Sequence, residues 1–136
     1  MSYPSSHTYE TIYVVKSSLS EATAGAIHQK VDQVIQKFEG KVRTREDWGL
    51  REMAYPIDKQ THGKYSVVVY NGKGGVVDEI ERHFKISDDV IRFLTVSVPA
   101  DYDYNRYKQQ ASLFEEEARK AREYREQKKR ERQQQG

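Results

Sequence analysis

The chain has 136 residues, enough for one domain with an appendage, and it contains no cysteine, which excludes disulfides, cysteine–zinc sites and thiol catalysis. Charged residues make up 32% and hydrophobic residues 36% of the chain, so we expect part of it to lie outside the core. No apolar run approaches the ~20 residues of a membrane-spanning helix, and the polar N-terminus does not resemble a signal peptide, so we expect a cytoplasmic protein with no membrane partner.

The net charge of +2 conceals an asymmetry along the chain. Residues 1–104 carry 13 Lys/Arg against 15 Asp/Glu, a net −2, whereas residues 105–136 carry 10 against 6, a net +4. The basic excess therefore lies in the C-terminal segment. It fits either an arm that binds a polyanion or a solvated lone helix.

The first elements are a strand and a helix. Residues 9–16 are β-branched and aromatic, a composition typical of a buried strand. Ser18 and Glu21 then fit a capping box, and the apolar residues from Ile27 to Phe38 form one stripe of a helix.

From Lys41 the pattern changes to a period of two, which predicts a strand with Lys41, Arg43 and Arg45 on one face. Gly49 marks an expected kink or bulge in this strand. Because proline cannot donate a hydrogen bond to a ladder, Pro56 predicts that the strand lies at a sheet edge or ends there.

The next elements are a hairpin strand, a short helix and a last strand. A turn over residues 58–63 leads into a strand over residues 64–70. After a glycine-rich break, a short amphipathic helix begins at Val76, and residues 90–98 form the last strand. The order β-α-β-β-α-β predicts an α+β, ferredoxin-like split βαβ fold, with a four-stranded antiparallel sheet, two helices on one face and the other face open to partners.

The chain divides by composition into three parts. We expect a flexible arm over residues 1–7, the ferredoxin-like domain over residues 8–98, and a linker with a basic helical tail over residues 99–136. The tail carries a narrow apolar seam at 4-3-4-3 spacing. Its members are Tyr107, Ala111, Phe114, Ala118 and Ala121.

Catalytic and metal-binding patterns are missing from the sequence. The histidines at positions 7, 28, 62 and 83 are scattered, and the glycine-rich turn before Val76 lacks the phosphate-loop pattern. We therefore expect no enzyme, no metal, no cofactor and no small-molecule substrate.

Nucleic-acid binding fits the sequence better. The segments 12–15 and 63–68 faintly resemble the two RNA-recognition-motif signatures, although tyrosines at such strand positions are also ordinary core residues. The basic row of Lys41, Arg43 and Arg45, continued by Arg51, fits either a track for a phosphate backbone or a solvated strand face.

The run Gly49-Leu50-Arg51-Glu52-Met53-Ala54-Tyr55-Pro56-Ile57 closely resembles the signature of the sixth-protein family of the bacterial small ribosomal subunit. Flanking Glu46-Asp47-Trp48, Tyr9-Glu10 and Asp89-Val90-Ile91-Arg92 agree, and the resemblance covers about residues 8–98. Two positions depart from the family pattern. Met53 stands where Leu is usual, and Asp58 replaces a commonly basic or Asn position.

The resemblance implies a non-catalytic structural protein that binds small-subunit ribosomal RNA as a pair with the eighteenth protein of that subunit. On this basis we expect RNA contacts from six cations: Arg43, Arg45, Arg51, Lys59, Lys64 and Arg92. We expect packing or protein-interface roles for Trp48, Met53 and Tyr55. A free-standing single-stranded RNA binder is the alternative, and a small-molecule-sensing or oligomerising ferredoxin-like domain is a third possibility.

Overall fold

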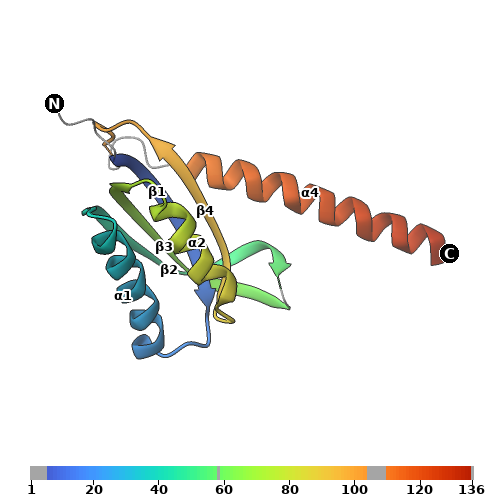
Figure 1. Ribbon diagram of the computed structural model, residues 1–136. Coiled ribbons are helices and arrows are strands. Elements are labelled where there is room, and N and C mark those ends of the chain that lie inside the picture. Colours follow the sequence, from blue (N-terminus) through green and yellow to red (C-terminus); the bar gives the residue numbers. More distant parts are fainter. Residues whose placement is uncertain (1–5, 58, 104–109, 136) are drawn as a thin grey trace.

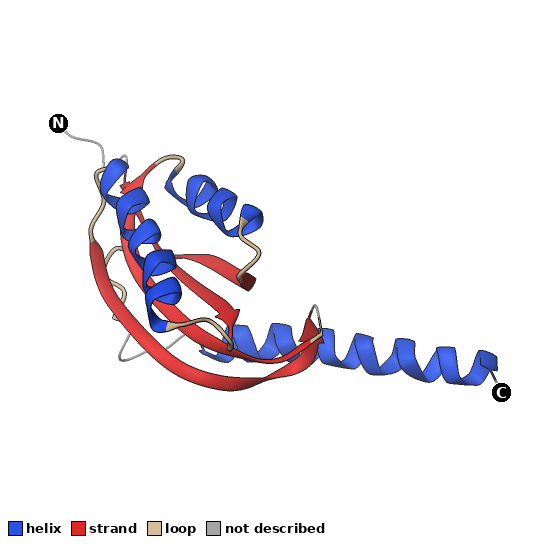
Figure 2. Ribbon diagram, turned by 90° about the horizontal axis from the view of Figure 1, so that it is seen from below, coloured by secondary structure: helices blue, strands red, loops and turns tan. Residues whose placement is uncertain are grey.

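The computed structural model describes residues 6–57, 59–103 and 110–135, with only the backbone described at residues 6, 110–115 and 135. Its elements in chain order are β1 (Ser6–Lys16), α1 (Glu21–Lys37), β2 (Val42–Ile57), β3 (Gln60–Lys73), α2 (Val76–Ile86), β4 (Val90–Val98) and α4 (Gln110–Gln135). The strands form one antiparallel sheet in the order β2-β3-β1-β4. Helices α1 and α2 cover one face of this sheet (Figure 1), and α4 lies on the other side (Figure 2). The predicted fold and the C-terminal helix are confirmed.

Some boundaries differ from the sequence prediction. Helix α1 is capped by Ser20 rather than Ser18, and the Ser20 hydroxyl accepts a hydrogen bond from the Thr23 N–H at 3.1 Å. The turn predicted over residues 58–63 is tighter, because β3 already begins at Gln60. Lys59 takes the left-handed conformation there, with φ of 65°.

A core layer fills the space between the sheet and the two helices. Tyr13 and Tyr70 point from β1 and β3 into this layer, where they meet Ile35 of α1 and Ile80 of α2. Alternate residues of the same strands point to the opposite face. The central strands therefore bury both faces, which explains why their sequences are continuously apolar.

The sheet face opposite α1 and α2 carries a second core and is not open as predicted. Val14, Val67 and Met53 pack there with Tyr102, which comes from the segment after β4. Tyr102 is 6% exposed, and its hydroxyl donates to the Glu10 carboxylate at 2.9 Å. The chain after β4 thus folds back over the sheet and covers part of the predicted partner surface.

The tail continues this cover. Helix α4 contacts β2, and two residues near the start of its described side chains, Glu117 and Ala121, are buried. Of the predicted seam, Ala121 is therefore buried, whereas Ala118 is exposed. The other members lie outside the described side chains: Tyr107, Ala111 and Phe114.

Candidate RNA and protein interface

Strand β2 contains the signature run and three irregularities in its pairing with β3, and the first two set where its side chains point. Its pairing with β3 shifts register between Val42 and Thr44 and again between Asp47 and Gly49. Gly49 has φ of 74°, so the predicted bulge at this glycine is confirmed. The shift at Arg43 gave no glycine or proline signal in the sequence.

The first irregularity separates two cations that were predicted to share a face. The Arg43 guanidinium reaches the segment after β4 and donates to the carbonyl oxygens of Ala100 at 2.7 Å and Tyr102 at 3.1 Å. Arg45 instead reaches α1 and forms an ion pair with Asp32. The prediction of one basic row along this strand is wrong, because an extra residue breaks the period of two.

Arg45 belongs to a polar network beneath α1. Besides its ion pair with Asp32, it donates to the Tyr13 hydroxyl at 3.1 Å, and this hydroxyl is also hydrogen-bonded to His28. Burial raises the pKa of Tyr13 to about 12. Burial, reinforced by the charge of Arg45, lowers the pKa of His28, so its imidazole is kept neutral.

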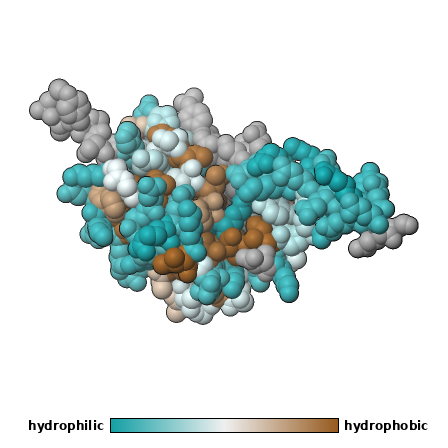
Figure 3. Space-filling view, turned by 45° about the vertical axis from the view of Figure 1, so that its right-hand side comes forward, coloured by the Kyte–Doolittle hydropathy of each residue, from teal (hydrophilic) through white to brown (hydrophobic). Residues whose placement is uncertain are grey.

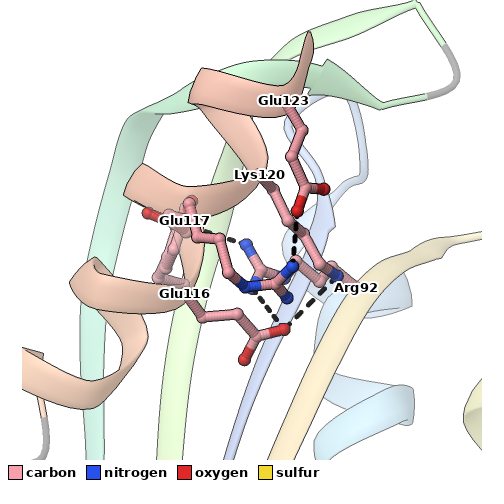
Figure 4. Close-up of polar contacts among 7 residues, drawn as sticks. Arg92, Glu116, Glu117, Lys120 and Glu123 are labelled. Atoms are coloured by element: carbon pink, nitrogen blue, oxygen red, sulfur yellow. Dashed lines mark hydrogen bonds and ion pairs between the residues drawn. The ribbon is translucent and has the colours of Figure 1, made fainter.

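Arg92 of β4 lies in a buried ionic cluster with α4 (Figure 4). Its Nη1 is 3.1 Å from Glu117 and its Nη2 is 3.2 Å from Glu116. Tyr65 of β3 donates to the same Glu117 carboxylate at 2.9 Å, and burial together with this carboxylate raises the tyrosine's pKa. We call these four residues the Arg92 cluster.

Arg92 is only 9% exposed. A ligand therefore cannot reach its guanidinium while α4 is docked, and its contacts are with the chain itself. No local pattern predicts this burial, because the covering glutamates follow about 25 residues later in a helix whose composition is typical of a solvated one.

The remaining three predicted cations lie on the β2–β3 hairpin. Arg51 places its guanidinium carbon 5.1 Å from the centre of the Trp48 ring. Lys64 is half-buried and donates to the Leu19 carbonyl at 3.2 Å. Lys59 is exposed at the hairpin turn. The structure thus brings Arg51, Lys59 and Lys64 onto one hairpin and places Arg92 elsewhere.

The predicted interface residues line the face of β2 opposite α1 and α2. Trp48 stacks on Tyr65 with ring centroids 6.3 Å apart and planes inclined by 14°. Met53 is 7% exposed and belongs to the core of this face. Tyr55 is half-buried, with the Arg92 guanidinium carbon 5.9 Å from its ring centre. Met53 is thus a packing residue, and only Trp48 and Tyr55 keep partly accessible surfaces.

Sequence reasoning missed Leu50, which lies within the signature and is 60% exposed. It pairs across the hairpin with Lys64, and both residues line a groove of about 350 Å³ beside the start of α1. The signal available in the sequence was a single leucine between two charged stretches of a predicted edge strand.

The described residues offer little for catalysis or metal binding. Among residues 6–57, 59–103 and 110–135, no group of three or more His, Asp or Glu side chains is placed to hold a metal ion. None of the helices in these ranges is long and apolar enough to cross a membrane. What the hairpin presents instead is cations, two partly accessible aromatics and one exposed leucine.

Comparisons with known proteins give the family. A family model described as Ribosomal protein S6 matches residues 8–97. The small ribosomal subunit protein bS6 of Sulfurovum sp. (strain NBC37-1) is 41% identical over 88 residues, which cover 65% of this chain and 69% of that protein. The bS6 protein of Citrifermentans bemidjiense is 38% identical over 96 residues, covering 71% and 72%.

A solved structure agrees on the fold. The crystal structure of 30S ribosomal protein S6 from Thermotoga maritima superposes with a TM-score of 0.63 at 22% identity, covering 79% of this chain and 97% of that one. The family match spans β1 to β4, whereas α4 lies beyond it. The chain therefore belongs to the ribosomal protein S6 family.

Proposed function

We propose that the chain is a structural component of the small ribosomal subunit that binds small-subunit ribosomal RNA together with the eighteenth protein of that subunit. The observation that carries the proposal is the family match over residues 8–97, which reach from β1 to β4 and include both sheet-packed helices. The family is one of ribosomal structural proteins rather than enzymes.

The β2–β3 hairpin is the proposed RNA contact. Arg51 and Lys59 present their charges on or near its surface, and Lys64 pairs with Leu50 close by. Arg43, Arg45 and Arg92 have a different role in this proposal. Their guanidinium groups are held by the chain's own carbonyl and carboxylate oxygens, so they stabilise the scaffold that carries the hairpin.

The protein partner is proposed to contact β2, because this edge strand has a free side and carries the accessible apolar surface. Trp48 and Tyr55 are half-buried on one of its faces, and Leu50 is exposed on the other. A domain with a net charge of −2 over residues 1–104 attracts RNA weakly by itself. A second protein that shares the site supplies the missing contacts.

The free-standing single-stranded RNA binder is less well supported. Such a module stacks bases on exposed aromatic rings of its sheet. Here Tyr13 is fully buried under the helices, and Tyr65 is 3% exposed beneath Trp48 and Glu117. Neither ring at the two motif-like strands is accessible to a base.

Reconstitution tests the proposal directly. The full chain is mixed with purified eighteenth protein and an RNA fragment of the central domain of the small-subunit RNA, and ternary binding is measured against salt concentration. We expect Arg51→Gln with Lys59→Gln to lower the slope of log affinity against log salt by about 1–2, since each lost phosphate contact removes about 0.9. Arg82→Gln with Lys85→Gln, two exposed cations of α2, is the matched control and should leave it unchanged.

A second pair of variants addresses the protein partner. Leu50→Asp should weaken binding of the eighteenth protein, whereas Ile86→Asp, at a position that is 67% exposed on the far end of α2, should not. Absence of any complex between the wild-type chain, the RNA and the partner would refute the proposed function. So would a sucrose gradient in which the endogenous protein never sediments with the small subunit.

A further inference from the structure

Helix α4 has a docked end and a projecting end. Glu117 and Ala121 are buried against the domain, whereas every residue from Arg122 to Arg130 is exposed. The projecting end extends well beyond the sheet (Figure 1), and its visible surface is hydrophilic (Figure 3). The family match ends at residue 97, so the family relationship does not account for this segment.

Half of the cations on this helix are neutralised by glutamates of the same helix. Arg119 lies 2.8 Å from Glu123, and Lys128 lies 3.4 Å from Glu131. Two further pairs of this kind are Lys120 with Glu116 and Arg130 with Glu126. The distances in these two pairs are 3.3 Å and 3.7 Å. All four cations are thus balanced by carboxylates of their own helix.

The other four cations follow a different pattern. They are Arg122, Arg125, Lys129 and Arg132, and we call them the basic stripe. Within the described part of the chain, none of them has a carboxylate within ion-pair distance. The 3-4-3 spacing places all four within an arc of about 80° and along roughly 15 Å of one helix face.

This sorting of charge has an energetic consequence. Like charges at i,i+3 and i,i+4 repel, at a cost of about 0.2–0.5 kcal/mol for each pair. The helix contains six glutamates, yet none lies between members of the basic stripe on that face. An anionic ligand that lies along the stripe removes the repulsion and uses all four charges together.

The stripe suits a phosphate backbone better than the other polyanionic surfaces. A membrane-binding helix needs an apolar face, and the exposed part of α4 has only Tyr124 as a large apolar residue. A protein interface needs buried aromatic or aliphatic anchors, which the stripe lacks. Single-stranded RNA is bound through aromatic stacking, and Tyr124 lies on another side of the helix, against Lys128.

We propose that the basic stripe of α4 binds the phosphate backbone of double-helical RNA, without reading its sequence. A-form RNA displays closely spaced phosphates, and its deep, narrow major groove keeps side chains from the bases, so contacts to the backbone are what a row of cations makes. This inference rests on the proposed ribosomal function. It adds a second RNA contact, on a segment outside the family domain.

Two matched triple variants of the full chain test the stripe. Arg122→Gln, Arg125→Gln and Lys129→Gln remove three stripe cations, whereas Arg119→Gln, Lys128→Gln and Arg130→Gln remove three paired ones. Each set changes two arginines and one lysine on the same helix and lowers the net charge equally. Circular dichroism establishes that both variants keep their helix content.

Binding is measured by fluorescence anisotropy with a labelled RNA duplex of about 24 base pairs and arbitrary sequence, at a series of salt concentrations. For the wild type we expect log affinity to fall with log salt with a slope near −3 to −4, and for the stripe variant a slope smaller in magnitude by about 2–3. The control should stay within about 1 of the wild type. Equal losses for both triple variants, or no binding of the wild type at low salt, would overturn the proposal.

The duplex assay contains neither the eighteenth protein nor a ribosomal sequence. Its failure therefore leaves the proposed function standing, and that function is tested separately by the Arg51 and Lys59 variants. If the Arg51 and Lys59 variants fail to assemble with the ribosomal RNA and the eighteenth protein but still bind the duplex, the stripe acts as an independent RNA contact.

Discussion

Replacing Arg92 with methionine should release α4 from the sheet. Methionine keeps much of the side-chain volume but removes the charge, so Glu117 is left buried without this cation, and the Tyr65 hydroxyl is its remaining partner among the described side chains. The two charged side chains of this pair are 8% and 9% exposed, so water cannot replace the lost contact while the helix stays docked.

The size of the loss is limited by the helix itself. Breaking a buried ion pair costs about 3–5 kcal/mol when the remaining charge stays buried. Here α4 can detach and return Glu117 to water, so the cost cannot exceed the free energy of docking. Two charge-assisted hydrogen bonds to one carboxylate, taken at the low end of about 1.5 kcal/mol each, suggest a docking free energy of about 3 kcal/mol. That corresponds to a fall in melting temperature of roughly 10–20 °C for a domain of this size.

Urea unfolding of the full chain, followed by fluorescence of Trp48, measures this loss. The same substitution in a chain ending at Asp103 should cost less than about 1 kcal/mol, because the glutamates of the Arg92 cluster are then missing. Arg82→Met, at a side chain that is 58% exposed, is the control and should stay within about 0.5 kcal/mol of the wild type. An equal loss in the long and the short chain would refute the assigned role of Arg92.

Three further predictions concern buried groups and backbone. Burial raises the pKa of Glu10, partly offset by the Tyr102 hydroxyl, so its ionised form destabilises the fold at neutral pH. Glu10→Gln should therefore raise the unfolding free energy at pH 7, and this gain should vanish as the pH falls to roughly 4. Because the pKa of His28 is lowered on folding, stability should decrease as the pH falls below about 6.5, and His28→Gln should reduce that decrease in urea titrations at pH 7 and pH 5. Gly40→Ala would place a Cβ 1.9 Å from the Asn71 carbonyl oxygen and should cost about 1–3 kcal/mol, whereas Gly25→Ala in helix α1 meets no atom within 4 Å and should stabilise by about 0.5–1 kcal/mol in thermal melts.

The fold was predictable because its signals are local. Runs of β-branched and aromatic residues located the central strands, a period of two located β2, and an apolar stripe located α1. The glycine at position 49 predicted the bulge, and it adopts a positive φ that other residues rarely take. The edge position that Pro56 predicted for β2 also holds, since the sheet order begins with this strand. Each of these inferences depends on residues close together in the sequence.

The candidate site was less predictable because its geometry depends on distant segments. Arg43 and Arg45 look equivalent in the sequence, yet an unsignalled irregularity sends one towards Tyr102 and the other towards Asp32. The burial of Arg92 requires a helix from the end of the chain. A pattern identifies which residues carry charge, but the partner that holds each charge is set by tertiary contacts.

The two edges of the sheet differ in how well they resist pairing with another chain. Edge strand β2 has three register irregularities, one proline and six charged residues, all of which disfavour the docking of a foreign strand. Edge strand β4, Val-Ile-Arg-Phe-Leu-Thr-Val-Ser-Val, has no proline and a single charge, which Glu117 neutralises. Such a segment favours self-association into stacked strands. Helix α4 contacts β4 through the Arg92–Glu117 ion pair but packs mainly against β2, so it does not cap the edge of β4. Of the two edges, β4 is therefore the one at which another strand should add.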